Sequence, residues 1–207
     1  MPPSSEIKPA DHPEFIFIGE HSAIDFANTR VVDHGDPKEL FRSWADVVGW
    51  LSQAKLVTSE SVELPETAGT RALESVIEFR QAWEKVLSEL VAGGKISHAF
   101  LERLNGFLAL GTFHEILRRD GKKGFRVARS SSHLHGEKLA LNLIAHQIAD
   151  FLAEANLDYV HRCANTTSCV LYFYDTTKNH RRQWCSVATC GNRHKVAQFR
   201  KRQVQAG

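Results

Sequence analysis

The sequence predicts a mainly α-helical N-terminal domain with one small β-hairpin, followed by a small C-terminal module that contains four cysteines. Apolar residues recur at helical spacing over most of the first 155 residues, and every cysteine lies between positions 163 and 190. A chain of 207 residues with 43% hydrophobic and 24% charged residues has the composition of a globular protein. We therefore expect a flexible tail at 1–14, a helical domain at 15–157 and the small module at 158–207.

The first elements follow from caps and apolar periodicity. Residues 15–18 form a short apolar strand or lead-in segment, and residues 22–30 form one or two helical turns. Residues 33–37 (DHGDP) are typical of a turn. Three longer helices are predicted: one capped by Ser43 and running to about Ala54, one over 70–92 that ends at Gly93-Gly94, and one capped by Ser97.

The apolar period then changes. Residues 113–129 alternate around Asp120-Gly121, which predicts the β-hairpin. Residues 139–155 are apolar over most of a helical circumference, which predicts a buried central helix. In the C-terminal module we expect a strand at 170–174 and a helix from about Cys190 to about Arg202.

Secretion and membrane insertion are not expected. No apolar run approaches the ~18 residues that a membrane span requires. The first fourteen residues are polar and rich in proline, without the apolar core of a signal peptide. We therefore expect a cytoplasmic protein that has no membrane partner.

The charge is divided unevenly along the chain. Residues 161–207 contain nine Lys or Arg and one acidic residue, Asp175, a net charge of +8, whereas the whole chain carries +2 and residues 1–160 therefore carry −6. A basic C-terminal segment predicts a polyanionic partner. The alternative is a solvated tail that binds nothing.

The cysteines, Cys163, Cys169, Cys185 and Cys190, form two close pairs with five and four intervening residues, separated by fifteen residues. This spacing favours one structural Zn²⁺ in a zinc-ribbon or treble-clef-like module, and two disulfides are the alternative. Four thiolates would close the coordination sphere, so the predicted role of the metal is structural and not catalytic. Zinc would also stabilise a module that is too small to fold on its own core.

The segment RCANTTSCVLYFYDTTKNHRRQWCSVATCGNRHKVAQFRKR resembles the CGNR zinc finger, which is named for residues 190–193. The first cysteine pair is spaced by five residues here, where we expect four. The segment SAIDFANTR, residues 22–30, resembles the opening of the ABATE domain that usually precedes this finger. The resemblance implies a bacterial, stress-linked transcription regulator whose finger binds DNA.

Basic side chains of the finger are the predicted contacts to nucleic acid, with duplex DNA as the expected partner and RNA as the alternative. The candidates are Arg181, Arg182, Arg193, Lys195, Arg200, Lys201 and Arg202. Two residues of the CGNR motif have structural alternatives: Asn192 could bond the local backbone and Arg193 could pair with Asp175. Trp184 and the strand aromatics at 172–174 are expected to form a small core, with base stacking as the alternative.

The N-terminal domain is expected to sense a small-molecule effector or to form a homodimer. A candidate pocket is lined by His21, Asp25, Asn28 and Arg30, although capping and a local salt bridge would also explain these residues. We find no nucleophile elbow, phosphate-binding loop or dinucleotide fingerprint, so no enzymatic activity is expected. The remaining alternatives are a small-molecule enzyme with the zinc module as a scaffold, and a protein-interaction module.

Overall fold

The structure is a computed structural model, and it describes residues 14–33, 35–57, 62, 66–111, 114–121, 124–130 and 134–206. The tail expected at 1–14 lies outside the described residues, apart from Glu14. Within the described part, no helix is both long enough and apolar enough to cross a lipid bilayer.

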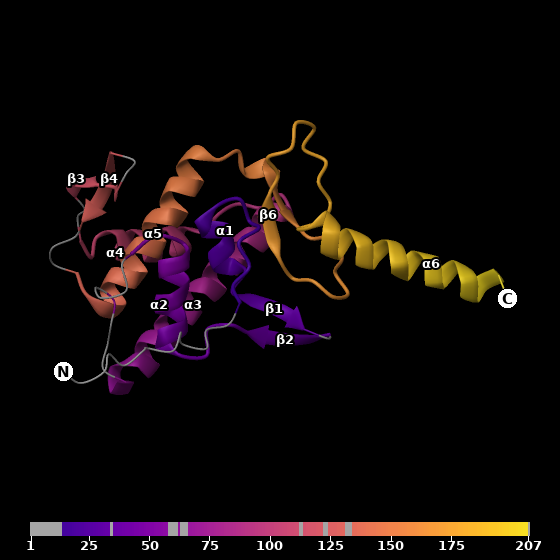
Figure 1. Ribbon diagram of the computed structural model, residues 1–207, viewed down its shortest axis with the longest axis horizontal. Helices are drawn as coiled ribbons and strands as arrows, with labels where there is room; N and C mark the ends of the chain where they lie inside the picture. The colour runs from indigo at the N-terminus through magenta and orange to yellow at the C-terminus, as the bar shows by residue number, and fades with distance from the viewer. Residues whose placement is uncertain are drawn as a thin grey trace.

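Five helices build the body of the protein (Figure 1). They are α1 (Ser22–Ala27), α2 (Trp44–Gln53), α3 (Glu66–Val91), α4 (His98–Leu108) and α5 (Gly136–Glu154). Ser43 caps α2 in a capping box, because its side chain accepts from the Asp46 N–H while the Asp46 side chain accepts from the Ser43 N–H. Ser97 caps α4 as predicted, whereas α3 begins four residues before the predicted start at Thr70.

The core lies where α3 and α5 pack around the short helix α1. Trp83 of α3 is fully buried, and its indole N–H donates to the carbonyl of Ala23 in α1 at 2.8 Å. Phe79 and Phe151 bring further ring contacts from α3 and α5. The predicted burial of α5 is confirmed, since Ile144, Ala145 and Ile148 are all at most 1% exposed.

In the described part of the chain, three antiparallel strand pairs are attached to this body. They are β1 (Arg30–Asp33) with β2 (Asp36–Glu39), β3 (His114–Arg119) with β4 (Phe125–Ser130), and β5 (Val160–Arg162) with β6 (Tyr172–Tyr174). The hairpin predicted at 113–129 is confirmed over its described residues. The sequence predicted only a turn at 33–37 and missed β1–β2, because β2 reads DPKE and lacks the β-branched and aromatic residues typical of strands. Residues 15–18 form no strand.

The C-terminal segment ends in a helix that leaves the body (Figure 1). A turn of π-helix, Val187–Gly191, contains Cys190 and leads directly into α6 (Asn192–Ala206). The figure shows α6 as a rod that extends away from the other helices, with the C-terminus at its far end. Its principal packing contact is with the π-helical turn that precedes it.

The body and the cysteine-rich segment each contribute side chains to the other's hydrophobic cluster. Val160 of β5 and Tyr172 of β6 belong to the same buried cluster as the aromatic residues of α1, α2 and α3. In the other direction, Ile16, Ile18 and Val31 pack against a second cluster, which the four cysteines form with Leu171 and Phe173. The module is therefore attached to the helical body by side chains contributed from both sides.

Candidate metal centre and basic surface

The four cysteine sulfurs converge at one point. All four side chains are buried, and their sulfurs lie within 4.8 Å of one another. The Cys169 and Cys185 sulfurs are 3.6 Å apart, and the Cys185 and Cys190 sulfurs are 3.5 Å apart. A tetrahedral site with Zn–S bonds of about 2.3 Å requires sulfurs about 3.8 Å apart, whereas a disulfide requires about 2.05 Å. The cysteines are unbridged, so the disulfide alternative is wrong.

Hydrogen bonds within the cluster show why it suits a cation. Bonds from Cys169 and Cys185 lower the pKa of the Cys163 thiol, whereas donation to Cys163 raises the pKa of the Cys169 and Cys185 thiols, and burial raises both further. One buried thiolate therefore opposes the ionisation of its neighbours. A divalent cation reverses this opposition, because it binds all four sulfurs as thiolates.

The CGNR motif has a local structural explanation. Gly191 is buried, and a Cβ at this position would lie 3.2 Å from Cδ1 of Trp184, so a larger residue would crowd the indole ring. The Asn192 side chain donates to the carbonyl of Ala188 at 2.9 Å, which fixes the turn around Cys190. This bond is the structural alternative expected for Asn192. Arg193 is exposed at the start of α6.

Asp175 has partners other than Arg193. Its carboxylate accepts from the backbone N–H of Arg182 at 2.8 Å and from the N–H and hydroxyl of Thr177 at 2.9 and 2.6 Å. It thereby closes the loop between β6 and Cys185. The pairing of Arg193 with Asp175, which the sequence left open, is not formed among the described contacts.

The two neighbouring arginines Arg181 and Arg182 lie in different environments. The Arg182 guanidinium lies 4.5 Å from the centroid of the buried Phe173 ring and donates to the carbonyl of Cys185 at 2.5 Å and of Trp184 at 3.0 Å. Arg181 is exposed. Arg182 therefore makes contacts within the module, whereas Arg181 is available at the surface.

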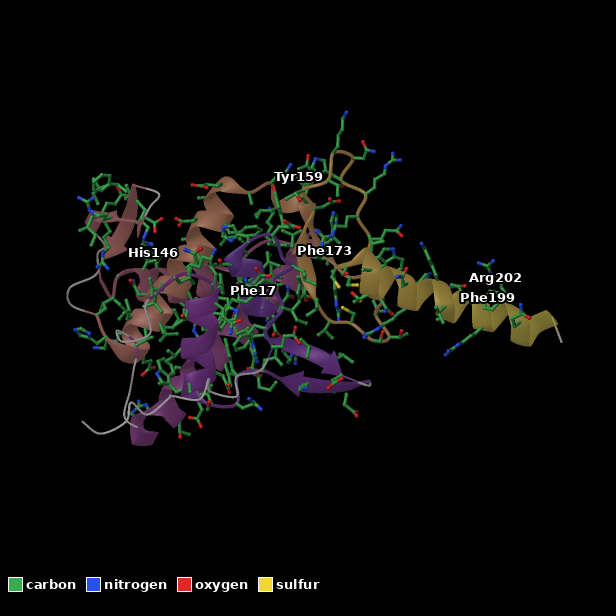
Figure 2. The ribbon with its side chains drawn as sticks, in the orientation of Figure 1. Phe17, His146, Tyr159, Phe173, Phe199 and Arg202 are labelled. Atoms are coloured by element: carbon green, nitrogen blue, oxygen red, sulfur yellow. The ribbon has the colours of Figure 1, made fainter. Side chains whose placement is uncertain are left out.

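The other predicted basic side chains are exposed on α6. Arg193, Lys195, Arg200 and Arg202 all reach solvent, and the side chain of Lys201 lies outside the described residues. Figure 2 shows Arg202 and Phe199 on the part of α6 that stands clear of the body. Phe199 is 62% exposed, and no residue of α6 is acidic.

A shallow concave surface beside α6 adds basic groups that were not predicted from the sequence. It is lined by Arg181 together with Arg162, Trp184 and three histidines, His161, His180 and His194. The Trp184 and His194 rings lie 4.6 Å apart, so the indole is partly covered by the first turn of α6. Arg162 directly precedes the first metal ligand, Cys163, and this position could have identified it from the sequence as a basic residue of the finger surface.

No cavity formed by the described residues is lined by all four residues of the predicted N-terminal pocket. His21 caps α1 by accepting from the Ala23 N–H, and Asp25 is buried and accepts from the Gly19 N–H at 2.7 Å. Burial lowers the pKa of His21 and raises the pKa of Asp25 to about 6. Asn28 bonds the backbone of Tyr172, and Arg30 pairs with Glu84 at 3.0 Å. Of the four, only Arg30 lines a polar cavity between α3 and the finger strands.

Two family models match the chain. Residues 20–155 match ABATE, described as a putative stress-induced transcription regulator. This chain belongs to the ABATE family. Residues 160–203 match the CGNR zinc finger, so both resemblances expected from the sequence are confirmed. No curated protein matches the chain.

The ABATE match contains Asp25 and Asn28, and the finger match contains all four metal ligands. Cys163, Cys169, Cys185 and Cys190 hold one structural zinc ion. When bound, the zinc supplies a fixed tetrahedral cross-link and offers no open position for a substrate. The chain's own contribution is to bring β5, β6 and the turn before α6 to a single point.

Proposed function

We propose that this protein is a stress-linked transcription regulator that binds duplex DNA through α6 and the adjacent concave surface of the zinc finger. The observation that carries the proposal is the isolation of α6. It is a fifteen-residue helix with exposed basic side chains, without an acidic residue and with little packing against the body. The family description of ABATE as a transcription regulator supports this function.

The physical chemistry of α6 favours a polyanionic partner. An isolated helix of about 15 residues is only marginally stable in water. Arg193 and Lys195 place positive charge in its first turn, where the helix dipole is also positive. Phosphate groups alongside the helix would offset this repulsion and would order the far end of the rod.

The dimensions of α6 suit a DNA groove. Fifteen residues extend about 22 Å, and the major groove of B-DNA admits one α-helix. The zinc cluster fixes the first turn through Cys190, so the rod is oriented before it meets DNA. Arg162 and Arg181 on the concave surface would then contact the neighbouring phosphates.

The proposal is tested by titrating full-length, zinc-loaded protein with duplex DNA at several salt concentrations. If about five basic groups contact phosphates, log K falls against log salt with a slope of about −4 to −5. We expect the double variant R193A/R200A to weaken binding at least tenfold and to reduce the slope by about 2. The matched control R71A/K138A removes two exposed charges from the helical body and leaves the slope unchanged.

Two results would contradict the proposal. A slope near zero would remove the electrostatic argument, and an R193A/R200A variant as tight as the control would exclude α6 from the interface. Single-stranded RNA that competes better than duplex DNA at matched salt would favour the RNA alternative.

The helical body would supply the regulatory input, through an effector or through a second copy of the chain. A single module buries little DNA surface and discriminates few base pairs, so two copies would be needed for a selective site. Sedimentation of the protein with and without DNA would test this. A species with two chains per duplex supports the homodimer, and one chain per duplex at saturation contradicts it.

A further inference from the structure

A polar cavity of about 320 Å³ lies where α3 meets the finger strands. One wall is a single face of α3, formed by Gln81, Glu84, Lys85 and Ser88. The other walls come from Arg30 at the start of β1, Arg162 of β5 and Tyr172 of β6. The cavity therefore spans the segments matched by the two family models.

The charge in this cavity is unbalanced. Three cations, Arg30, Lys85 and Arg162, line it from three different elements, and Glu84 is the one acidic residue among the described residues that line it. Glu84 is already bound from two sides, by Arg30 at 3.0 Å and by Arg80 at 3.3 Å. No ion pair with a described residue neutralises Lys85 or Arg162.

We infer that this cavity binds a small polyanion, bearing carboxylate or phosphate groups, between Arg30, Lys85 and Arg162. Its volume is at the lower end of the range for ligand pockets, which fits a compact anion. Arginine forks bind planar carboxylates and phosphates through two hydrogen bonds, and Lys85 adds a point charge.

The bound anion would compete with Glu84 for Arg30. The Glu84 side chain is 14% exposed, and its partial burial raises the pKa of its carboxyl, so its ionised form is less favourable than that of an exposed carboxylate. Removing this competitor should strengthen binding of the anion. An increase in affinity on substitution is a result that a purely structural role for Glu84 would not produce.

The test uses full-length, zinc-loaded protein and isothermal titration with two probes, pyrophosphate and citrate. We expect saturable binding of at least one probe, and the tighter probe identifies phosphate or carboxylate as the preferred group. K85A and R162A should each weaken binding at least tenfold, and E84Q should strengthen it severalfold. The control K95A removes an exposed charge outside the cavity and should bind like the wild type.

Further measurements distinguish a loss of anion binding from a loss of the folded structure. Each variant is first checked for its zinc content and its circular dichroism spectrum, and the probe should raise the melting temperature of the wild type more than that of K85A. The inference is overturned if neither probe binds saturably, or if K85A and R162A bind as tightly as K95A.

Anion binding in this cavity can be tested separately from the proposed function. If the protein does not bind DNA but does bind pyrophosphate or citrate, the cavity is an anion site and the proposed DNA-binding function is wrong. If instead duplex DNA displaces the probe and K85A weakens DNA binding by the same factor, the cavity belongs to the nucleic-acid interface and the small-ligand inference is wrong.

Discussion

The side chain of Asn28 makes two hydrogen bonds to the backbone of Tyr172. Its Nδ2 donates to the Tyr172 carbonyl and its Oδ1 accepts from the Tyr172 N–H, both at 2.9 Å. Asn28 ends α1 in the ABATE segment, and Tyr172 begins β6 in the zinc finger. A carboxamide can donate and accept hydrogen bonds at the same time. The Asn28 side chain therefore satisfies both backbone groups of Tyr172, as the backbone of a neighbouring strand would.

Substituting Asn28 should therefore destabilise the whole chain. N28A leaves a buried N–H and a buried C=O without partners, which costs about 2–4 kcal/mol in the free energy of unfolding. Chemical denaturation of the zinc-loaded protein measures this loss. Asn105, exposed on α4, provides the control N105A, which should change stability by less than about 0.5 kcal/mol. An N28A variant as stable as N105A would contradict this role for Asn28.

The two adjacent arginines should separate stability from binding. R182A removes the contacts to Phe173 and to the Cys185 carbonyl, so it should lower the melting temperature and weaken zinc retention against a chelator. R181A should leave both unchanged and should reduce DNA affinity severalfold, because its side chain is exposed. Equal melting temperatures for the two variants would show that Arg182 does not support the metal centre.

Removal of zinc should loosen part of the helical body. Purified protein should carry one zinc per chain, and chelation or C185S should release it. Because Ile16 and Ile18 pack on the cysteines and Tyr172 belongs to the main core, amide exchange should rise in α1 as well as in β5–β6. Zinc added back after chelation should restore protection. If exchange in α1 were unchanged without zinc, the finger would fold independently of the body.

Asp25 should make stability depend on pH. Its pKa is raised from 3.8 to about 6 in the folded state, so the folded state binds more protons than the unfolded state between these values. Stability from this group therefore falls as pH rises through this window, by about 1 kcal/mol between pH 5 and pH 8. D25N keeps an acceptor for Gly19 and removes the charge.

The difference in unfolding free energy between wild type and D25N, measured at pH 5 and pH 8, checks this expectation. The wild type should lose about 1 kcal/mol relative to D25N at the higher pH. Zinc-ligand protonation affects both proteins equally and cancels in the comparison. A difference that does not change with pH would show that Asp25 titrates normally.

Local signals in the sequence predicted much of this structure. Ser43 and Ser97 cap their helices through neighbours three residues away, and the Asp120-Gly121 turn closes β3–β4. The cysteine spacing predicted the zinc site because one short turn brings the two cysteines of each pair together. Each of these features depends on residues that are close in the chain.

The features that were missed depend on distant residues. Asn28 and Tyr172 are 144 positions apart, so their hydrogen bonds leave no local signal in the sequence. From the sequence alone, Asn28 could therefore not be recognised as a structural residue instead of a pocket residue. Arg182 resembles its neighbour Arg181 until Phe173 and the Cys185 carbonyl are brought beside it. The cavity between Arg30, Lys85 and Arg162 likewise exists only after α3 and β5 have packed together.

The seating of Ile16 and Ile18 on the cysteine cluster has a consequence for how this gene can be rearranged. A fusion that transferred residues 160–203 alone to another protein would lose the aliphatic cover of its metal and the amide that holds its second strand. We therefore expect the finger to retain its metal and its fold only when the helical body accompanies it.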